Sequence, residues 1–369
     1  MSQRFLGIEI GGTKLQVGVG EASGPPLLAL RRTDVQPEKG AEGIRARIAE
    51  LAAPLIAEYR PAAAGIAFGG PLDARAGRTL RSHHIAGWED FPLADWCRET
   101  LGLPAVLGND ADLAGLAEAR FGAGRGHQAV FFFTVGTGIG GALIYQGKIY
   151  GGSCGIAAEL GHLRPGPGAR DPGDDLESYS AGWGIAKNAR TCVTTILAEG
   201  ILAEDATSPE DAEAVLRWRQ RLQWEDLPLP PEGTRAAVIR QGAQDLLQRA
   251  DGDPARLSAK LVGEAARQGN PVAHCILRRA TRTLGWAVAQ MITLLAPSCV
   301  VVGGGVSLLG EELFFAPLRR EVEQYVFPAL RGTYRIVPAA LGEEVMVHGA
   351  VALAADSVKS GIRPGRWNL

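Results

Sequence analysis

The stretch FFFTVGTGIGGALIY, residues 131–145, predicts a strand, a glycine-rich turn and a second strand. Before it, GNDAD at residues 108–112 stands between the apolar run 104–107 and a segment whose apolar residues have helical spacing. An acidic residue at the start of a helix and a glycine-rich turn between strands are the parts that a phosphoryl-transfer site needs. We expect the remainder of the chain to form the frame that holds these parts.

The pattern of strand, glycine turn and strand occurs twice. FLGIEIGGTKLQVGV at residues 5–19 alternates apolar residues on both sides of a Gly-Gly-Thr centre, which predicts a hairpin like the one at 131–145. A third glycine turn ends the apolar run CVVVGGG at 299–305. The two hairpins predict two related α/β domains that face each other. The first domain would comprise residues 1–125, with a C-terminal helix at 344–360 packing back on it, and the second would comprise residues 126–343.

The remaining segments predict a frame of helices and strands. Apolar spacing predicts helices, and short apolar runs that end in glycine predict buried strands. The expected helices are 43–59, 93–101, 180–202, 271–295 and 345–358, and the expected buried strand is 62–68. Residues 164–175 are rich in Gly, Pro and Asp and predict a loop. Residues 200–258 are interpreted as a solvent-exposed insertion whose shape and role the sequence does not define.

Composition limits the classes of partner. The chain has 369 residues, enough for two cores, with 38 Lys+Arg against 40 Asp+Glu and a pI of about 6.3. This balance predicts no nucleic-acid and no membrane partner, and it favours small molecules. The five cysteines contain no Cys-x-x-Cys pair, which predicts neither a disulfide framework nor a zinc cluster. Without a signal-type segment or a long apolar run, the expected location is cytoplasmic.

Each motif also has a simpler interpretation. The pattern Gly136-x-Gly138-x-x-Gly141 fits a dinucleotide-binding fingerprint, but that fingerprint needs a helix after the glycines, whereas residues 142–148 predict a strand and turn. Gly12-Thr13-Lys14 does not have the order of a Walker A motif. Asn109 and Asp110 are favoured helix N-caps, and Glu159 and His162 fit a polar helix edge. The joint order of these features along the chain is what favours a phosphate site.

This ordered set resembles the ROK family (repressor, open reading frame, kinase), particularly its bacterial glucokinase-like sugar kinases. The matching segments are 7–20, 65–71, 87–93, 103–126, 131–162, 176–182 and 271–307. The resemblance implies the actin-like ATPase fold, of the ribonuclease H-like α/β class, with two α/β domains around a cleft and usually a homodimer. It also implies ATP-dependent phosphorylation of a hexose, first of all glucose to glucose 6-phosphate, with Mg²⁺ arriving with ATP.

The resemblance assigns roles to individual residues. Asp110 matches the general base that accepts the proton of the attacking sugar hydroxyl. The positions that would contact the sugar are Gly70, His84, Asn109, Asp110, Glu159, His162 and Glu177. The positions that would contact ATP are Gly11, Gly12, Thr13, Lys14, Gly136, Thr137, Gly138, Gly304 and Gly305. Glycines at such positions let backbone N–H groups approach an anion closely.

Three departures from the family pattern affect these expectations. Glu9 stands where the family usually has the Asp that helps to orient magnesium, and the longer side chain moves that charge. The family's three-cysteine zinc loop is absent, because residues 164–176 contain no cysteine, so we expect no structural zinc. His84, preceded by His83, stands where the family often has a sugar-contacting Asn, and this change bears on sugar preference.

Alternatives remain open at this stage. A kinase for fructose, mannose or an N-acetylhexosamine fits the same residues, and a catalytically weak or silent sugar sensor fits the change at Glu9. A DNA-binding repressor is disfavoured, because only six residues precede Gly7. The retained Asp110 argues against a silent sensor, since a binding-only site needs no base. The sequence leaves open the hexose, the effect of Glu9, a phosphoryl donor other than ATP, and the oligomeric state.

Overall fold

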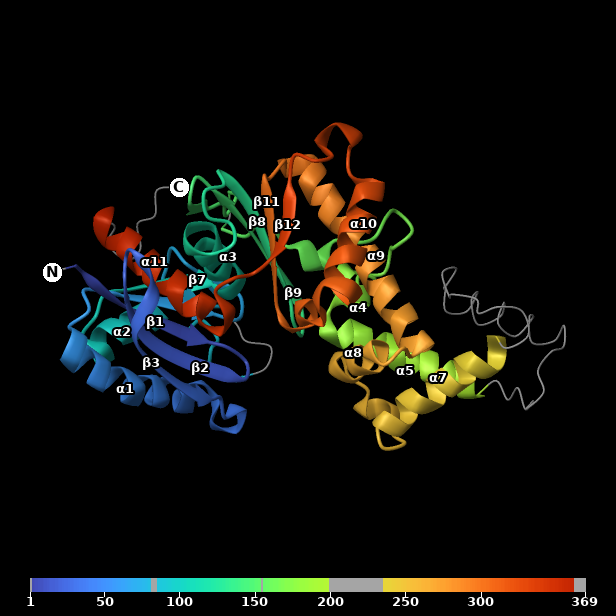
Figure 1. Ribbon diagram of the computed structural model, residues 1–369. Helices are drawn as coiled ribbons and strands as arrows, with labels where there is room; N and C mark the ends of the chain where they lie inside the picture. Colours follow the sequence, from blue (N-terminus) through green and yellow to red (C-terminus); the bar gives the residue numbers. More distant parts are fainter. Residues whose placement is uncertain (1, 81–84, 154, 199–234, 362–369) are drawn as a thin grey trace.

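The computed structural model describes residues 2–80, 85–153, 155–198 and 235–361 (Figure 1). The chain forms two five-stranded sheets, which lie side by side with helices around them. We call the first sheet and its helices, together with the last helix of the chain, the first lobe. The second sheet and its helices form the second lobe. The predicted domain boundaries at residues 125 and 343 stay a prediction.

The first sheet has the strand order β3-β2-β1-β4-β7. Strands β1 and β2 form an antiparallel hairpin in which Ile10 pairs with Leu15, which confirms the first predicted hairpin. β4 and β7 then add in parallel. The strands are β1 (Arg4–Ile10), β2 (Lys14–Glu21), β3 (Gly24–Asp34), β4 (Ala64–Phe68) and β7 (Ala105–Asn109), and a small ribbon pairs β5 (Leu72–Asp73) with β6 (Arg78–Thr79).

The second sheet repeats this topology, with the order β10-β9-β8-β11-β12. The hairpin of β8 and β9 is antiparallel, as predicted, and β11 and β12 add in parallel. A strand therefore follows the glycines at 136–138, which confirms that the dinucleotide fingerprint does not apply. The strands are β8 (Ala129–Val135), β9 (Ile139–Tyr145), β10 (Lys148–Ile149), β11 (Cys299–Gly303) and β12 (Arg335–Pro338).

The helices agree with the predicted spacing where the apolar stripe is long. α2 and α9 have the predicted bounds, and Asn270 caps α9 by accepting hydrogen bonds from the amides of Val272 and Ala273. The helices of the first lobe are α1 (Gly40–Tyr59), α2 (Leu93–Leu101), α3 (Asp110–Phe121) and α11 (Val345–Lys359). Those of the second lobe are α4 (Leu176–Ser180), α5 (Gly182–Ala198), α7 (Arg235–Arg249), α8 (Ala259–Arg267), α9 (Pro271–Leu295) and α10 (Ala316–Tyr325).

Short helical turns complete the two lobes. They lie between the longer elements, and three of them, η2, η4 and η7, border the site described below. They are η1 (Pro37–Lys39), η2 (Leu160–His162), η3 (Pro254–Arg256), η4 (Gly305–Leu309), the π-helical η5 (Glu311–Phe315), η6 (Pro328–Leu330) and η7 (Gly342–Glu344). No helix in the described part of the chain combines the length and the apolar character that a membrane span requires.

The helix predicted over 180–202 is confirmed in its described part as α5, which begins two residues later, because Ala181 between α4 and α5 has an extended backbone. One expectation for the middle of the chain was wrong. Residues 235–258 are not a solvent-exposed insertion. In α7, Ile239, Ala243 and Leu246 are buried against the other helices of the second lobe. The apolar spacing was not recognised in the sequence because charged residues stand between these three. Residues 199–234 lie outside the described residues.

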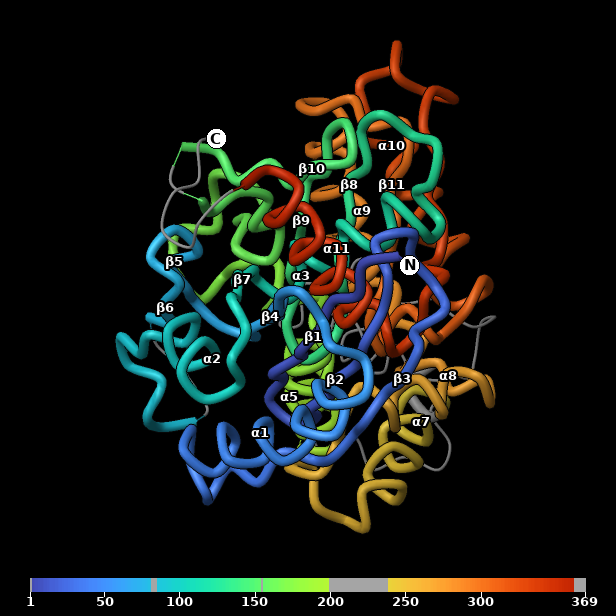
Figure 2. The backbone as a smooth tube through the Cα atoms, turned by 90° about the vertical axis from the view of Figure 1, so that its left-hand side faces the viewer, coloured from blue at the N-terminus to red at the C-terminus, as the bar shows by residue number. Residues whose placement is uncertain are grey.

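A shared core joins the two lobes. Helices α3 and α11 lie next to each other at the centre of Figure 2, and their apolar residues form one cluster with side chains of both sheets. Leu113 of α3 and Val351 of α11 belong to this cluster together with Phe132 of β8 and Val301 of β11. The start of α3 is therefore fixed against both sheets at once, which matters because Asp110 is its first residue.

Candidate active site

The first glycine turn lies at the end of β1, beside the end of β4. Residues 11–13 connect β1 to β2, and the Gly11 amide donates to the Lys14 carbonyl at 3.0 Å. The Gly69 amide, just after β4, donates to the Ile10 carbonyl at 3.1 Å. Gly12 and Thr13 are exposed at the tip, and Gly70 is half-buried. The turn therefore presents backbone to solvent at the edge of the first sheet where its parallel strands end.

Asn109 caps helix α3, and Asp110 directs its carboxylate toward the end of β4. The Asn109 side chain caps α3, accepting from the amides of Ala111 at 2.9 Å and Asp112 at 3.4 Å, so the simpler capping interpretation is right for Asn109. Asp110 Oδ1 accepts from the Ala111 amide at 2.8 Å. Its Oδ2 lies 3.3 Å from the point that a Cβ on Gly69 would occupy. Asp110 therefore faces the end of β4 beside the first turn.

Burial, and to a lesser degree neighbouring charges, raise the pKa of three carboxylates near the start of α3. Burial raises the pKa of Asp110, two backbone amides oppose this, and the charge of Glu159 raises it further. Burial, Glu159 and Asp110 raise the pKa of Asp112 to about 7. Burial likewise raises the pKa of Glu9, with Asp110 adding to the effect. These groups thus gather in one poorly solvated region, a setting in which general bases are found.

The second glycine turn is held by the start of α5. The Gly136 amide donates to the Gly138 carbonyl at 2.9 Å, and the Gly182 amide donates to the Gly136 carbonyl at 2.8 Å. At the start of β9, a Cβ on Gly140 would lie 2.9 Å from the Cβ of Ala111. The hairpin of the second lobe therefore touches the residue next to Asp110. This contact places β9, the strand that follows the second turn, beside the start of α3.

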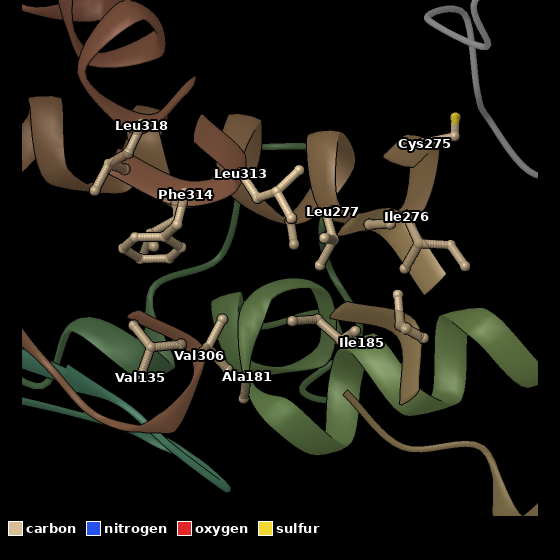
Figure 3. Close-up of a cluster of buried hydrophobic side chains, with 14 of the residues drawn as sticks. Val135, Ala181, Ile185, Cys275, Ile276, Leu277, Val306, Leu313, Phe314 and Leu318 are labelled. Carbon is tan, nitrogen blue, oxygen red and sulfur yellow. The ribbon is translucent and has the colours of Figure 1, made fainter. Parts of the chain in front are cut away.

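The third glycine turn lies against the end of β8. Gly304 has a φ of 88°, and a Cβ there would be 2.5 Å from the Val135 carbonyl oxygen, so only glycine fits. Gly305 faces open space. Figure 3 shows Val135, Ala181 and Val306, which adjoin the second turn, the start of α5 and the third turn, in one apolar cluster. This cluster fixes the two turns of the second lobe relative to each other.

The residues expected to bind the sugar differ in their contacts and in their exposure to solvent. Glu177 Oε1 accepts from the Ile139 amide at 2.5 Å and Oε2 accepts from the Trp183 indole at 3.3 Å, so this carboxylate also clamps the second turn. Glu159 is exposed and close enough to Asp110 to raise its pKa. His162 is exposed, with Nδ1 3.7 Å from Asp175 Oδ2. His84 lies outside the described residues.

Two residues of β2, Gln16 and Lys14, interact with Glu343 in the segment before α11. Glu9 is 5% exposed, and Gln16 donates through Nε2 to Glu9 Oε2 and, at 2.8 Å, to the Glu343 carbonyl. The ammonium of Lys14, expected at the phosphates, lies 3.8 Å from Glu343 Oε2. Gln16 was not among the predicted site residues, although a polar residue within the apolar strand 15–19 is a sequence signal of a buried polar partner.

The zinc expectation leads to a test by metal analysis. Among the described residues, no three His, Cys, Asp or Glu side chains are grouped to hold a metal ion. Because structural zinc needs four such ligands, we expect less than about 0.1 zinc per purified chain and no change in Tm after EDTA treatment. Inductively coupled plasma mass spectrometry measures the first quantity and scanning calorimetry the second. One tightly held zinc per chain would contradict the expectation.

The chain is similar to known proteins along most of its length. The ROK family model matches residues 5–223 and 237–357. A glucokinase from Thermotoga maritima is 30% identical over 355 residues, covering 96% of this chain and 98% of that protein. An N-acetylmannosamine kinase from Yersinia pestis is 36% identical over 165 residues, covering 44% of this chain and 54% of that protein.

A solved structure extends the similarity to the fold. The crystal structure of a ROK family glucokinase from Streptomyces griseus, in complex with glucose and AMPPNP, is 31% identical, with a TM-score of 0.69 over 96% of this chain and 99% of that one. The match covers nearly all of both chains. The predicted actin-like ATPase fold is therefore confirmed.

Proposed function

The chain belongs to the ROK family, and from this premise we propose that the protein transfers the γ-phosphoryl group of ATP to a hexose. Glucose is the first expected acceptor, giving glucose 6-phosphate. The observation that carries the proposal is the position of Asp110, which faces the end of β4 beside the first glycine turn while its neighbour Ala111 touches the hairpin of the second turn. Relatives of similar length that act on glucose support the choice of sugar.

The proposed reaction assigns one proton transfer to Asp110. The sugar hydroxyl oxygen forms a bond to the γ-phosphorus as the bond to the β,γ-bridging oxygen breaks and ADP leaves. Asp110 accepts the hydroxyl proton, and its raised pKa brings it closer to the range in which a general base is effective. Asn109, whose Oδ1 caps α3, would donate to the sugar through its amide nitrogen, and Glu159 would accept from it. The backbone of residues 11–13 and 136–138 would approach the phosphates.

The residues present fit magnesium bound with ATP. Glu9 Oε1 lies 3.8 Å from the point that a Cβ on Gly11 would occupy, so this oxygen is near the first turn, while Gln16 holds the other oxygen. A buried carboxylate oxygen is a ligand type that Mg²⁺ and its waters accept. When bound, magnesium would neutralise charge on the phosphates. Glu9 and Gln16 together would orient that charge from the first lobe.

A coupled assay of ADP release across a hexose panel tests the proposal. The panel contains glucose, fructose, mannose, N-acetylglucosamine and N-acetylmannosamine, the last because of the similarity to the Yersinia pestis kinase. We expect the largest kcat/KM with glucose, and no turnover of any sugar in the absence of Mg²⁺. Parallel reactions with polyphosphate in place of ATP, measured by the formation of the sugar phosphate because no ADP is released, identify the donor. Sugar binding without ADP release from any hexose would instead support the silent sensor.

The pH dependence of turnover gives a sharper prediction. The base must be ionised, so kcat should fall as pH falls through the pKa of Asp110, and burial moves this limb above the usual range of an aspartate. Because Glu159 contributes to the raised pKa, Glu159→Gln should move the acid limb to lower pH. The profile of kcat is measured with both substrates saturating, so that weaker sugar binding does not affect it. A limb that stays in place would exclude this coupling.

We further propose that the protein works as a cytoplasmic homodimer whose two lobes act as separate domains. The balanced charge and the family resemblance support this proposal. Sedimentation equilibrium at micromolar concentration measures the oligomeric state directly. A single species with the mass of one 38.9 kDa chain would contradict the dimer.

A further inference from the structure

A single buried carboxylate contacts both connections between the two lobes. Along the described residues the chain passes from the first lobe to the second between α3 and β8, and returns between β12 and α11. Glu118, near the end of α3, is 0% exposed. Its Oε2 accepts from the Ala123 amide in the first connection at 2.8 Å. Its Oε1 accepts from the amides of Ala340 and Leu341 in the second, each at 2.8 Å.

The residues of the first connection leave space for the Glu118 carboxylate and hydrogen-bond to its backbone. A Cβ on Gly122 would lie 2.0 Å from Glu118 Oε2, so a glycine leaves the space that the carboxylate occupies. The Glu118 carbonyl accepts from the amides of Gly122 at 3.1 Å and Gly124 at 3.0 Å. The first connection is therefore tied to Glu118 through both its side chain and its backbone. The three amides satisfy a charge whose burial without partners would be costly.

The second connection is held at both ends. It begins at the amides bound by Glu118, and it ends in η7, where the Glu343 carbonyl accepts from Gln16 at 2.8 Å. Glu118 and Asp110 lie on the same helix, eight residues apart, which corresponds to about 12 Å along its axis. The helix that carries the proposed base is thus joined to both connections by one side chain.

We propose that Glu118 is a positioning residue that fixes the angle between the lobes, and with it the position of Asp110 relative to the second glycine turn. The kinetic part of this inference rests on the proposed function. Its structural part does not, because the hydrogen bonds and the lobe angle exist without turnover. A shift of about 1 Å between a base and the reacting atoms is enough to cost up to a hundredfold in rate.

Glu118→Gln tests the inference with little change in shape. The amide oxygen can serve only one of the two connections, and the amide nitrogen then faces an N–H donor at the other. We expect kcat to fall at least about tenfold with a folded protein, and small-angle scattering to give a larger radius of gyration. Glu118→Asp, which keeps the charge but is too short to reach all three amides, should show a smaller effect in the same direction.

Asp245→Asn is the matched control. Asp245 accepts from Arg249 at 2.8 Å and Asn270 at 2.8 Å, and so joins two helices within the second lobe alone. The Asp245→Asn substitution should lower Tm. It should leave kcat within about twofold of the wild-type value and the radius of gyration unchanged, since the reacting groups stay in place. Wild-type kcat and scattering in both Glu118 variants would overturn the inference. So would an equal loss of kcat in Asp245→Asn.

Hydrogen exchange on the unmodified protein tests the same point without relying on a folded variant. If one carboxylate holds both connections, the amides of Ala123, Ala340 and Leu341 should open as one unit with a common free energy of opening. Different free energies of opening at the two connections would overturn the inference. A protein with a common free energy of opening that phosphorylates no hexose would contradict the proposed function and leave this structural part intact.

Discussion

Asp110→Asn should lower kcat by about 10²–10⁴-fold while the protein stays folded. Asparagine has the same shape and can still hydrogen-bond a sugar hydroxyl, but it cannot accept the proton. Since burial raises the pKa of Asp110, the ionised carboxylate destabilises the folded state above that pKa, and a neutral amide removes this cost. The Tm at pH 8 should therefore be unchanged or higher. Coupled kinetics and calorimetry on one preparation measure both quantities.

Asp112→Asn is the matched control for this substitution. Asp112 lies one helical position beyond Ala111, and burial also raises its pKa, to about 7. It takes no part in the proposed proton transfer, so kcat should stay within about tenfold of the wild type. If Asp110→Asn retained more than a tenth of the wild-type kcat, the proton would have another acceptor. A comparable loss in both variants would indicate that the local charge, and not the base, is what matters.

The two hairpins and their glycine turns could be predicted because their information is local. Alternating apolar residues define strands, and a Gly-Gly-Thr or Gly-Thr-Gly centre defines the turn between them, all within fifteen residues. The same is true of α9, whose start is marked by Asn270 and Pro271. The Asn109-Asp110 pair was partly predictable. The sequence predicted both a cap and a base, and only the hydrogen bonds of the Asn109 side chain show that Asn109 is the cap.

The contacts that the sequence could not show join residues far apart in the chain. Gln16 meets the Glu343 carbonyl across 327 positions, and Glu118 meets Leu341 across 223. Neither partner is a side chain with a recognisable motif, because both are backbone groups. The burial of α7 was missed for a related reason. Its few apolar residues stand among charged ones, and they can be recognised as a buried face only when α5 and α9 are seen to cover them.

Gly65→Ala, which adds one methyl group, should strongly lower the free energy of unfolding. Gly65 lies in β4 under α11, and a Cβ there would be 1.9 Å from the Ala350 carbonyl oxygen and 2.6 Å from its carbon. Both are backbone atoms, so no rotamer change relieves the overlap, and α11 must move off the sheet. We expect a cost of about 3 kcal/mol or more in the free energy of unfolding, measured by urea titration.

The control and the consequence for activity follow from the same contacts. Gly168→Ala places its methyl group where nothing lies within 4 Å, and it should leave the free energy of unfolding within about 0.5 kcal/mol of the wild type. Ala350→Gly should not rescue Gly65→Ala, because the overlap is with main-chain atoms. α11 also carries Gly349, where a Cβ would be 2.0 Å from the Leu113 carbonyl oxygen of α3. A displaced α11 therefore moves the helix that begins at Asp110, and Gly65→Ala protein that remains folded should lose turnover as well as stability.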